Sequence, residues 1–145
     1  MTPWLLLASL LHGSSALGQT ETSQTFGDYT VHYIAVNTTF LDPAIASQYN
    51  ITRGQRRGFL NISVLKNNPD AGTTAVTASI EGSRNNMLQQ SEPIEFTEVR
   101  EGDAIYYLGE FEFSNAEPVR FELMIQPEKQ GPFYPLQWST RLYIN

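Results

Sequence analysis

Hydrophobic and polar residues alternate with a period of two along most of this chain. In residues 119–126, for example, every second residue is large and apolar, which is typical of a strand with one buried face. Residues 29–36 are apolar on both faces, which predicts a strand covered on both sides. The other predicted strands are residues 60–65, 75–80, 94–99, 105–113 and 138–144.

Short segments rich in Gly, Pro, Asn and Asp separate these runs and predict turns. The predicted turns are residues 67–72, 81–83, 101–103 and 114–118. About seven short strands with such turns predict a mainly β fold, an antiparallel β-sandwich of immunoglobulin-like architecture. A closed barrel is the alternative.

One short helix is predicted near residues 43–49. Asp42 is suited to the N-cap position and Pro43 to the first helical position, and the residues that follow favour a helix. No repeat, linker or second domain is evident in the sequence.

The first residues have the pattern of an export signal. The apolar run 4–11 is shorter than the roughly 20 residues that span a bilayer, and small residues follow it. We therefore expect residues 1–18 to be a cleavable signal peptide, with cleavage before Gln19 or before Leu17. Residues 19–145 then form a single β-sandwich domain without stable insertion in the membrane.

Composition excludes several classes of function. The 145 residues include 9 Lys and Arg, 15 Asp and Glu, two His and no Cys, with a net charge of −6. Thiol chemistry and disulfides are excluded, and the acidic charge argues against binding to nucleic acid. No cofactor is expected, because the sequence contains no phosphate-binding loop and no metal-binding motif.

Catalytic residues are equally sparse. Signal cleavage would leave His32 as the sole histidine, and no nucleophile motif accompanies it. The pattern favours a histidine that packs within a sheet. The alternative is a small hydrolase in which His32 acts with carboxylates such as Asp28 or Asp103.

Arg53, Arg56 and Arg57 place three of the nine basic residues within five positions of an otherwise acidic chain. Guanidinium groups suit carboxylates and phosphates, so this segment and the neighbouring Tyr49 are our candidate contact for a partner or an anion. The alternative is that these arginines pair with carboxylates of the same chain.

Four glutamates, Glu92, Glu95, Glu98 and Glu101, recur at every third position. This spacing would form an acidic stripe on a helix, but Pro93 and the alternation around it favour a strand. A strand divides the four carboxylates between its two faces, which predicts a solvated acidic edge rather than a cation site.

Several segments, taken together in order, resemble one family. They are residues 26–33, 49–53, 58–65 and 99–107. They resemble the DUF4426 family, small exported proteins of Gram-negative bacteria with no assigned activity. The resemblance spans most of residues 26–125 and implies a periplasmic, mostly β domain. It supplies no catalytic residues.

These observations favour a non-enzymatic periplasmic module that binds another periplasmic protein or a peptide. Its loops or an open sheet edge would take the partner, for example by strand addition. Two alternatives remain: the His32 hydrolase, and a structural subunit of a larger envelope complex.

Overall fold

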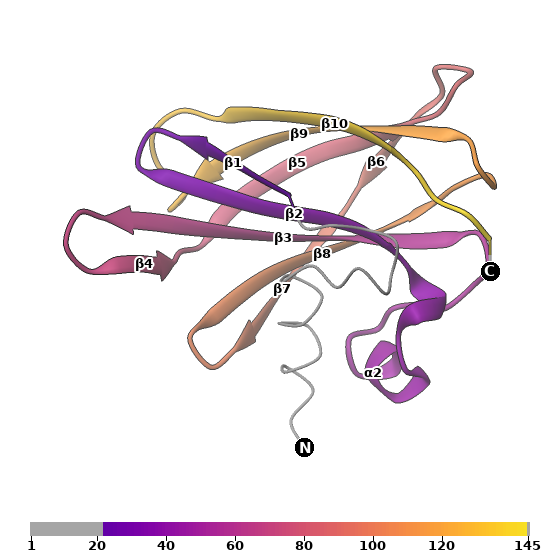
Figure 1. Cartoon of the computed structure of the whole chain (residues 1–145), viewed down its shortest axis with the longest axis horizontal. Coiled ribbons are helices and arrows are strands. Elements are labelled where there is room, and N and C mark those ends of the chain that lie inside the picture. Colours follow the sequence, from indigo (N-terminus) through magenta and orange to yellow (C-terminus); the bar gives the residue numbers. More distant parts are fainter. Residues whose placement is uncertain (1–21, 145) are drawn as a thin grey trace.

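The computed structural model describes residues 22–144. The predicted signal peptide and its cleavage positions lie outside the described residues. Ten strands, one 3-10 helix and one α-helix make up the described fold (Figure 1). They are β1 (Thr22–Phe26), β2 (Tyr29–Asn37), η2 (Thr38–Phe40), α2 (Pro43–Gln48), β3 (Arg57–Asn68), β4 (Gly72–Ala75), β5 (Ala78–Asn85), β6 (Ser91–Ile94), β7 (Phe96–Glu101), β8 (Ala104–Glu112), β9 (Pro118–Pro127) and β10 (Tyr134–Arg141).

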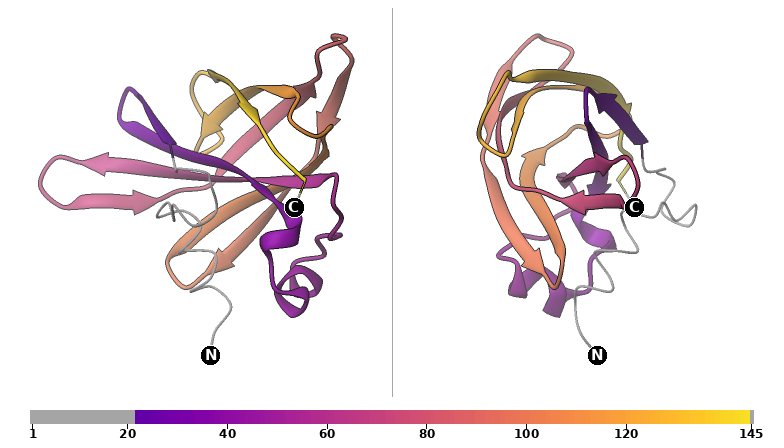
Figure 2. Two further views of the ribbon diagram at one scale, coloured as in Figure 1. Left: turned by 45° about the vertical axis from the view of Figure 1, so that its right-hand side comes forward. Right: turned by 90° about the vertical axis from the view of Figure 1, so that its left-hand side faces the viewer.

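The strands form two antiparallel sheets, so the prediction of a sandwich rather than a closed barrel is confirmed. Sheet A has the order β1-β2-β3-β8-β7, and β4 pairs with the far end of β3. Sheet B has the order β10-β9-β5-β6. Figure 2 shows the two layers from the side.

The inner faces of the two sheets meet in one core. Phe121, Leu123 and Ile125 of β9 are fully buried, as their alternation predicts, and they pack with buried residues of β3 such as Leu60 and Ile62. Burial of each such side chain stabilises the fold by about 1.5–3 kcal/mol.

Sheet A is also covered on its outer face. Ile34 and Val36 of β2 belong to a second buried cluster that includes Ile45 of α2, while Val31 of the same strand faces the main core. The prediction of a doubly covered strand is therefore confirmed. Helix α2 begins as predicted, because an Asp42 carboxylate oxygen accepts the N–H of Ala44 at 2.8 Å.

The predicted turn at residues 81–83 is wrong, because β5 runs through it without interruption. The reason is Gly82, which serves close packing instead of a turn. A Cβ at this position would lie 2.2 Å from Cδ2 of Leu123 and 2.7 Å from the carbonyl oxygen of Glu122. The turns at 67–72 and 101–103 are confirmed as the β3–β4 and β7–β8 connections.

Three predicted strands need correction. Residues 75–80 do not form one strand, because β4 of sheet A ends at Ala75 and β5 of sheet B begins at Ala78. Residues 94–99 do not form one strand, because β6 lies in sheet B, β7 lies in sheet A, and Glu95 alone separates them. The last strand is β10 at Tyr134–Arg141 rather than 138–144, since residues from Tyr134 onward pair with β9. Among residues 22–144, no helix has the length and apolar character needed to cross a bilayer.

Candidate functional site

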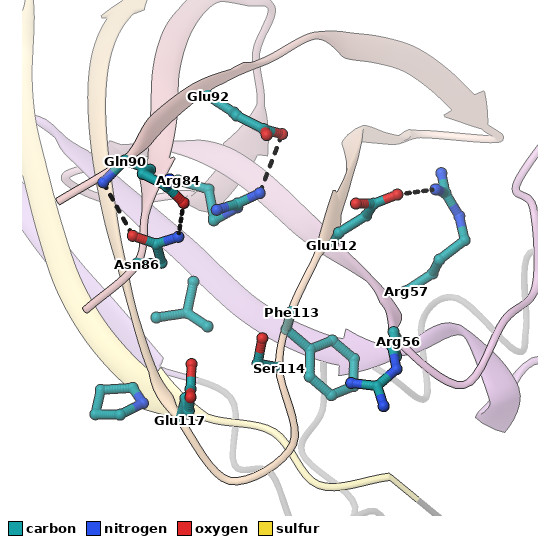
Figure 3. Close-up of a pocket in the computed structure, with 12 residues that line it drawn as sticks. Arg56, Arg57, Arg84, Asn86, Gln90, Glu92, Glu112, Phe113, Ser114 and Glu117 are labelled. Atoms are coloured by element: carbon teal, nitrogen blue, oxygen red, sulfur yellow. Dashed lines mark hydrogen bonds and ion pairs between the residues drawn. The ribbon is translucent and has the colours of Figure 1, made fainter. Parts of the chain in front are cut away.

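A cleft of about 380 Å³ opens between the two sheets at one end of the sandwich. Its walls come from the start of β3, the end of β5, the start of β6, the end of β8 and the start of β9 (Figure 3). Three arginines line it: Arg56, Arg57 and Arg84. The structure therefore combines two members of the predicted arginine segment with a third arginine from the other sheet.

Arg84 occupies a core-facing position of β5. It continues the alternation of Ala78 and Ile80 toward the inside of the sandwich, and it is only 7% exposed. One terminal nitrogen, Nη2, lies 3.0 Å from Oε2 of Glu92, whose own side chain is 64% exposed. The Nε of Arg84 is buried without a hydrogen-bond acceptor. A buried guanidinium with an unused donor is costly to maintain for stability alone.

The Arg57 side chain is fully engaged in local contacts. Its Nε donates to the carbonyl of Thr52 at 3.2 Å, and its terminal nitrogens lie 3.1 Å from Glu110 and 3.5 Å from Glu112. These bonds attach the loop before β3 to strand β8. Arg57 thus forms a fixed wall of the cleft.

Arg56 differs from its neighbours because it is exposed and its side chain has no hydrogen-bond or ion-pair partner within residues 22–144. Arg53, in contrast, donates from Nη2 to the carbonyl of Thr39 at 3.1 Å and does not line the cleft. Tyr49 packs against the cluster beneath α2, away from the cleft. The structure therefore separates Arg53 and Tyr49 from the other two predicted contact residues.

Three carboxylates accompany the arginines: Glu92, Glu112 and Glu117 line the same cleft. Glu92 and Glu112 are mostly exposed and already paired with Arg84 and Arg57. The donors without an acceptor belong to Arg56 and to the Nε of Arg84. Within the described residues, these are the two places in the cleft where a ligand oxygen could accept a hydrogen bond.

Strand pairing divides the regularly spaced glutamates, as expected, but not all four form a solvated edge. Glu98 accepts the hydroxyl of Tyr107 at 2.7 Å and Nε of Arg100 at 3.0 Å, and these bonds lower the pKa of its carboxyl. Burial raises the pKa of Glu101. Glu92 contributes to the cleft instead, so the segment is partly structural.

His32 lies in the middle of β2, opposite Ser63 of β3 and Ser23 of β1. Asp28 precedes it by four residues, which corresponds to about 13 Å along an extended strand. Asp103 lies in the β7–β8 turn, and strands β3 and β8 separate it from β2. Within residues 22–144, no three His, Asp or Glu side chains gather in a group suited to a metal ion.

At the opposite end of the sandwich, three polar side chains bond to one another. The Tyr29 hydroxyl donates to Glu128, whose carboxylate also lies 3.7 Å from Nζ of Lys66, and the hydrogen bond to Glu128 raises the pKa of Tyr29 to about 12. The rings of Phe26 and Tyr134 stack beside them at 5.1 Å between centroids. Side chains thus fill the gap between the start of β2 and the end of β9, and we call this place the closed end. A separate, open hollow of about 660 Å³ lies between β4 and the β7–β8 turn.

Arg84 is the residue that sequence reasoning missed. The signal was present: once Gly82 is placed inside a strand, Ala78, Ile80, Gly82 and Arg84 follow in one inward-facing series. A charged residue at a core-facing position is an informative exception. Interpreting residues 81–83 as a turn ended the strand before Arg84 and removed that signal.

Comparisons with known proteins agree with the fold. The profile of a family described as "Domain of unknown function (DUF4426)" matches residues 23–145. The chain is similar to a DUF4426 family protein of Pseudomonas aeruginosa whose crystal structure is known. The two share 29% identity with a TM-score of 0.73, over 86% of this chain and 96% of that one. No curated protein matches the chain.

Two more distant structures share the fold. FetP of uropathogenic Escherichia coli strain F11, which was expressed in the periplasm of E. coli, has a TM-score of 0.62 at 8% identity, over 88% of this chain and 96% of that one. A copper-bound variant of FetP has a TM-score of 0.60 at 8% identity, over 88% of this chain and 97% of that one. At this identity the similarity concerns the architecture alone.

Proposed function

The chain belongs to the DUF4426 family, whose function is unknown, and we propose from its geometry that it is a non-enzymatic binding module for acidic protein segments. A carboxylate of a partner protein or peptide enters the cleft and is bound by Arg56 and Arg84. The single observation that carries the proposal is the Nε of Arg84, buried at the cleft without an acceptor.

The charges of the cleft support a carboxylate as the bound group. Guanidinium groups bind carboxylates through directed, charge-assisted hydrogen bonds. Arg57 is held by Thr52, Glu110 and Glu112, so it shapes the cleft while Arg56 remains available. Because Glu92 is exposed, it can follow the Arg84 guanidinium. Rotation about the side-chain bonds of Arg84 would then present its unused Nε–H donor to a ligand.

We propose the periplasm as the site of action. The predicted signal peptide and the family resemblance favour export, and FetP, which shares the fold, was produced in the periplasm. The copper bound by a FetP variant is not extended to this chain, because the similarity is limited to the fold and residues 22–144 contain no suitable cluster of His, Asp and Glu.

The test compares two arginines of the same loop. The purified protein is labelled and applied to an array of short peptides that contain aspartate or glutamate, with the matching asparagine and glutamine peptides as controls. We expect Arg56→Ala to weaken binding of the acidic peptides about tenfold, since a hydrogen bond to a charged group is lost. Arg53→Ala, outside the cleft, leaves binding unchanged.

Equal binding of acidic and amide peptides contradicts the proposal. An equal effect of Arg53→Ala and Arg56→Ala contradicts it as well, because the loop would then act through its overall charge and not through the cleft.

A further inference from the structure

The connection between β5 and β6, residues 86–90, exposes two large apolar side chains next to the cleft. Met87 is 63% exposed and Leu88 is 78% exposed. The β5–β6 hairpin projects beyond the rest of the sandwich, at the upper right of Figure 1 and at the top of the left view in Figure 2. Its tip, which we call the hairpin tip, is therefore accessible to a partner.

Hydrogen bonds of one side chain hold the hairpin tip in shape. The side-chain oxygen of Asn86 accepts the N–H groups of Leu88 at 3.0 Å and Gln90 at 2.9 Å. The Asn86 amide nitrogen donates to the side-chain oxygen of Gln90 at 2.7 Å. The tip is thus pre-organised, so a partner that binds it loses little free energy in ordering it.

The hairpin tip and the cleft are parts of one surface. Asn86 and Gln90, which shape the tip, also line the cleft beside Arg84 (Figure 3). Met87 follows Arg84 by three positions and lies in the turn after β5, so the backbones of the two residues are at most about 10 Å apart. An extended segment of a partner covers this distance with about three residues.

We propose that the ligand is an extended segment of a partner protein in which an apolar residue lies about three positions from a carboxylate. The proposal rests on the function proposed above and deepens it. The carboxylate occupies the cleft at Arg56 and Arg84, and the apolar side chain packs on Met87 and Leu88. Methionine suits such a surface because its flexible side chain adapts to different apolar partners.

Charge favours a protein segment over an anionic membrane as the occupant. Exposed apolar side chains at a hairpin tip would also suit insertion into lipid. However, Glu92, Glu112 and Glu117 surround the cleft, and the chain carries a net charge of −6. Anionic headgroups would be repelled, whereas a single carboxylate can be directed to the free donors.

The experiment uses synthetic peptides of ten residues with one aspartate and one leucine at separations of one to six positions in an otherwise Gly/Ser sequence. Binding to the purified protein is measured by fluorescence anisotropy. We expect the tightest binding at a separation of about three. Leu88→Ser should weaken binding of that peptide about tenfold, because it removes the apolar contact with the peptide leucine.

Two controls isolate the hairpin tip. Phe133→Ser removes a different exposed apolar side chain, in the β9–β10 connection at the other end of the sandwich, and should leave affinity unchanged. Against Arg56→Ala, replacing the peptide aspartate by asparagine should have a smaller effect than against the unmodified protein, since only the interaction with Arg84 remains to be lost.

The outcomes separate this inference from the function on which it rests. Binding that requires aspartate but is independent of leucine, spacing and Leu88 overturns the hairpin inference and leaves the cleft proposal standing. Binding that is independent of aspartate overturns both. Binding to phosphatidylglycerol vesicles that is lost in Leu88→Ser, with no binding of any peptide, identifies a membrane contact and also overturns both.

Discussion

The two ends of the sandwich differ in how their charged side chains are bonded. At each end, charged side chains lie where the sheets separate and the core stops. At the closed end, Tyr29, Lys66 and Glu128 bond to one another. At the cleft end, Arg84 bonds to Glu92 by one nitrogen and leaves its Nε without an acceptor, while Arg56 has no partner within the described residues.

This difference indicates which end serves stability and which is available for binding. Side chains that already bond to one another gain no hydrogen bond when a ligand binds. A buried donor without an acceptor gains one. The comparison also explains why the arginine-rich segment is not one site. Arg57 and Arg53 are bonded within the chain, and only Arg56 faces the cleft unengaged.

The largest effect is expected at Tyr107, which connects the two sheets near the closed end. Its hydroxyl accepts the backbone N–H of Ala78 at 2.8 Å and donates to Glu98 at 2.7 Å. Tyr107→Phe leaves the N–H of Ala78 buried without an acceptor, so the free energy of unfolding in urea should fall by about 2 kcal/mol. Tyr143→Phe, at an exposed residue, is the control and should be neutral.

A smaller loss is expected from Tyr29→Phe. Removing the hydrogen bond to Glu128 should lower the free energy of unfolding by about 1 kcal/mol at pH 7. The folded pKa of Tyr29 is about 12 against an ordinary value of 10.0, so its contribution is complete below pH 10 and is lost as the pH rises toward 12. Urea titrations between pH 8 and 11.5 should show a shallower alkaline decline in the variant.

Tyr107 also titrates in that range, because burial and its bond to Glu98 raise its pKa to about 12. The fall in the free energy of unfolding at high pH should therefore be smaller in Tyr29→Phe than in the unmodified protein. It should be smallest in the double variant with both Tyr29→Phe and Tyr107→Phe. An unchanged decline in Tyr29→Phe would show that the closed end does not depend on this bond.

The smallest effect on stability is expected at the cleft end. Arg84→Met removes a buried charge and leaves Glu92 in contact with water, so the free energy of unfolding should stay constant or rise by about 1 kcal/mol. Binding of acidic peptides should be lost. In the matched variant Arg57→Met, stability should instead fall by about 1 kcal/mol, since Thr52, Glu110 and Glu112 lose their donor. A fall of more than about 2 kcal/mol in the free energy of unfolding of Arg84→Met would show that Arg84 serves the stability of the fold and would contradict this prediction.

Much of the fold could be predicted because period-two alternation depends on local geometry alone. Strands β3, β8 and β9 follow from it, β2 follows from a run that is apolar on both faces, and helix α2 follows from Asp42 and Pro43 at its start. The short strands β1, β4 and β6 could not be predicted, since their burial is low and they are set by pairing with distant partners. Gly82 misled the prediction because the same residue that permits turns also permits close contact between strands.

The candidate site was predictable only in part. The sequence identifies Arg56 and Arg57 by their clustering, but it cannot show that Arg57 is bonded and Arg56 is not. That distinction depends on Glu110 and Glu112, more than fifty positions away. The hairpin tip could not be predicted either. The exposure of Met87 and Leu88 follows from the hydrogen bonds of Asn86 and not from the chemistry of the two apolar residues.

The passage from β6 to β7 across Glu95 has a consequence for how the protein folds. Because a single residue joins an edge strand of one sheet to an edge strand of the other, β6 and β7 cannot move independently. Small single domains usually unfold in one cooperative transition, so we expect displacement of β6 at the cleft to disturb β7 in sheet A. The walls that hold a ligand and the core that sustains the domain therefore share one unfolding transition.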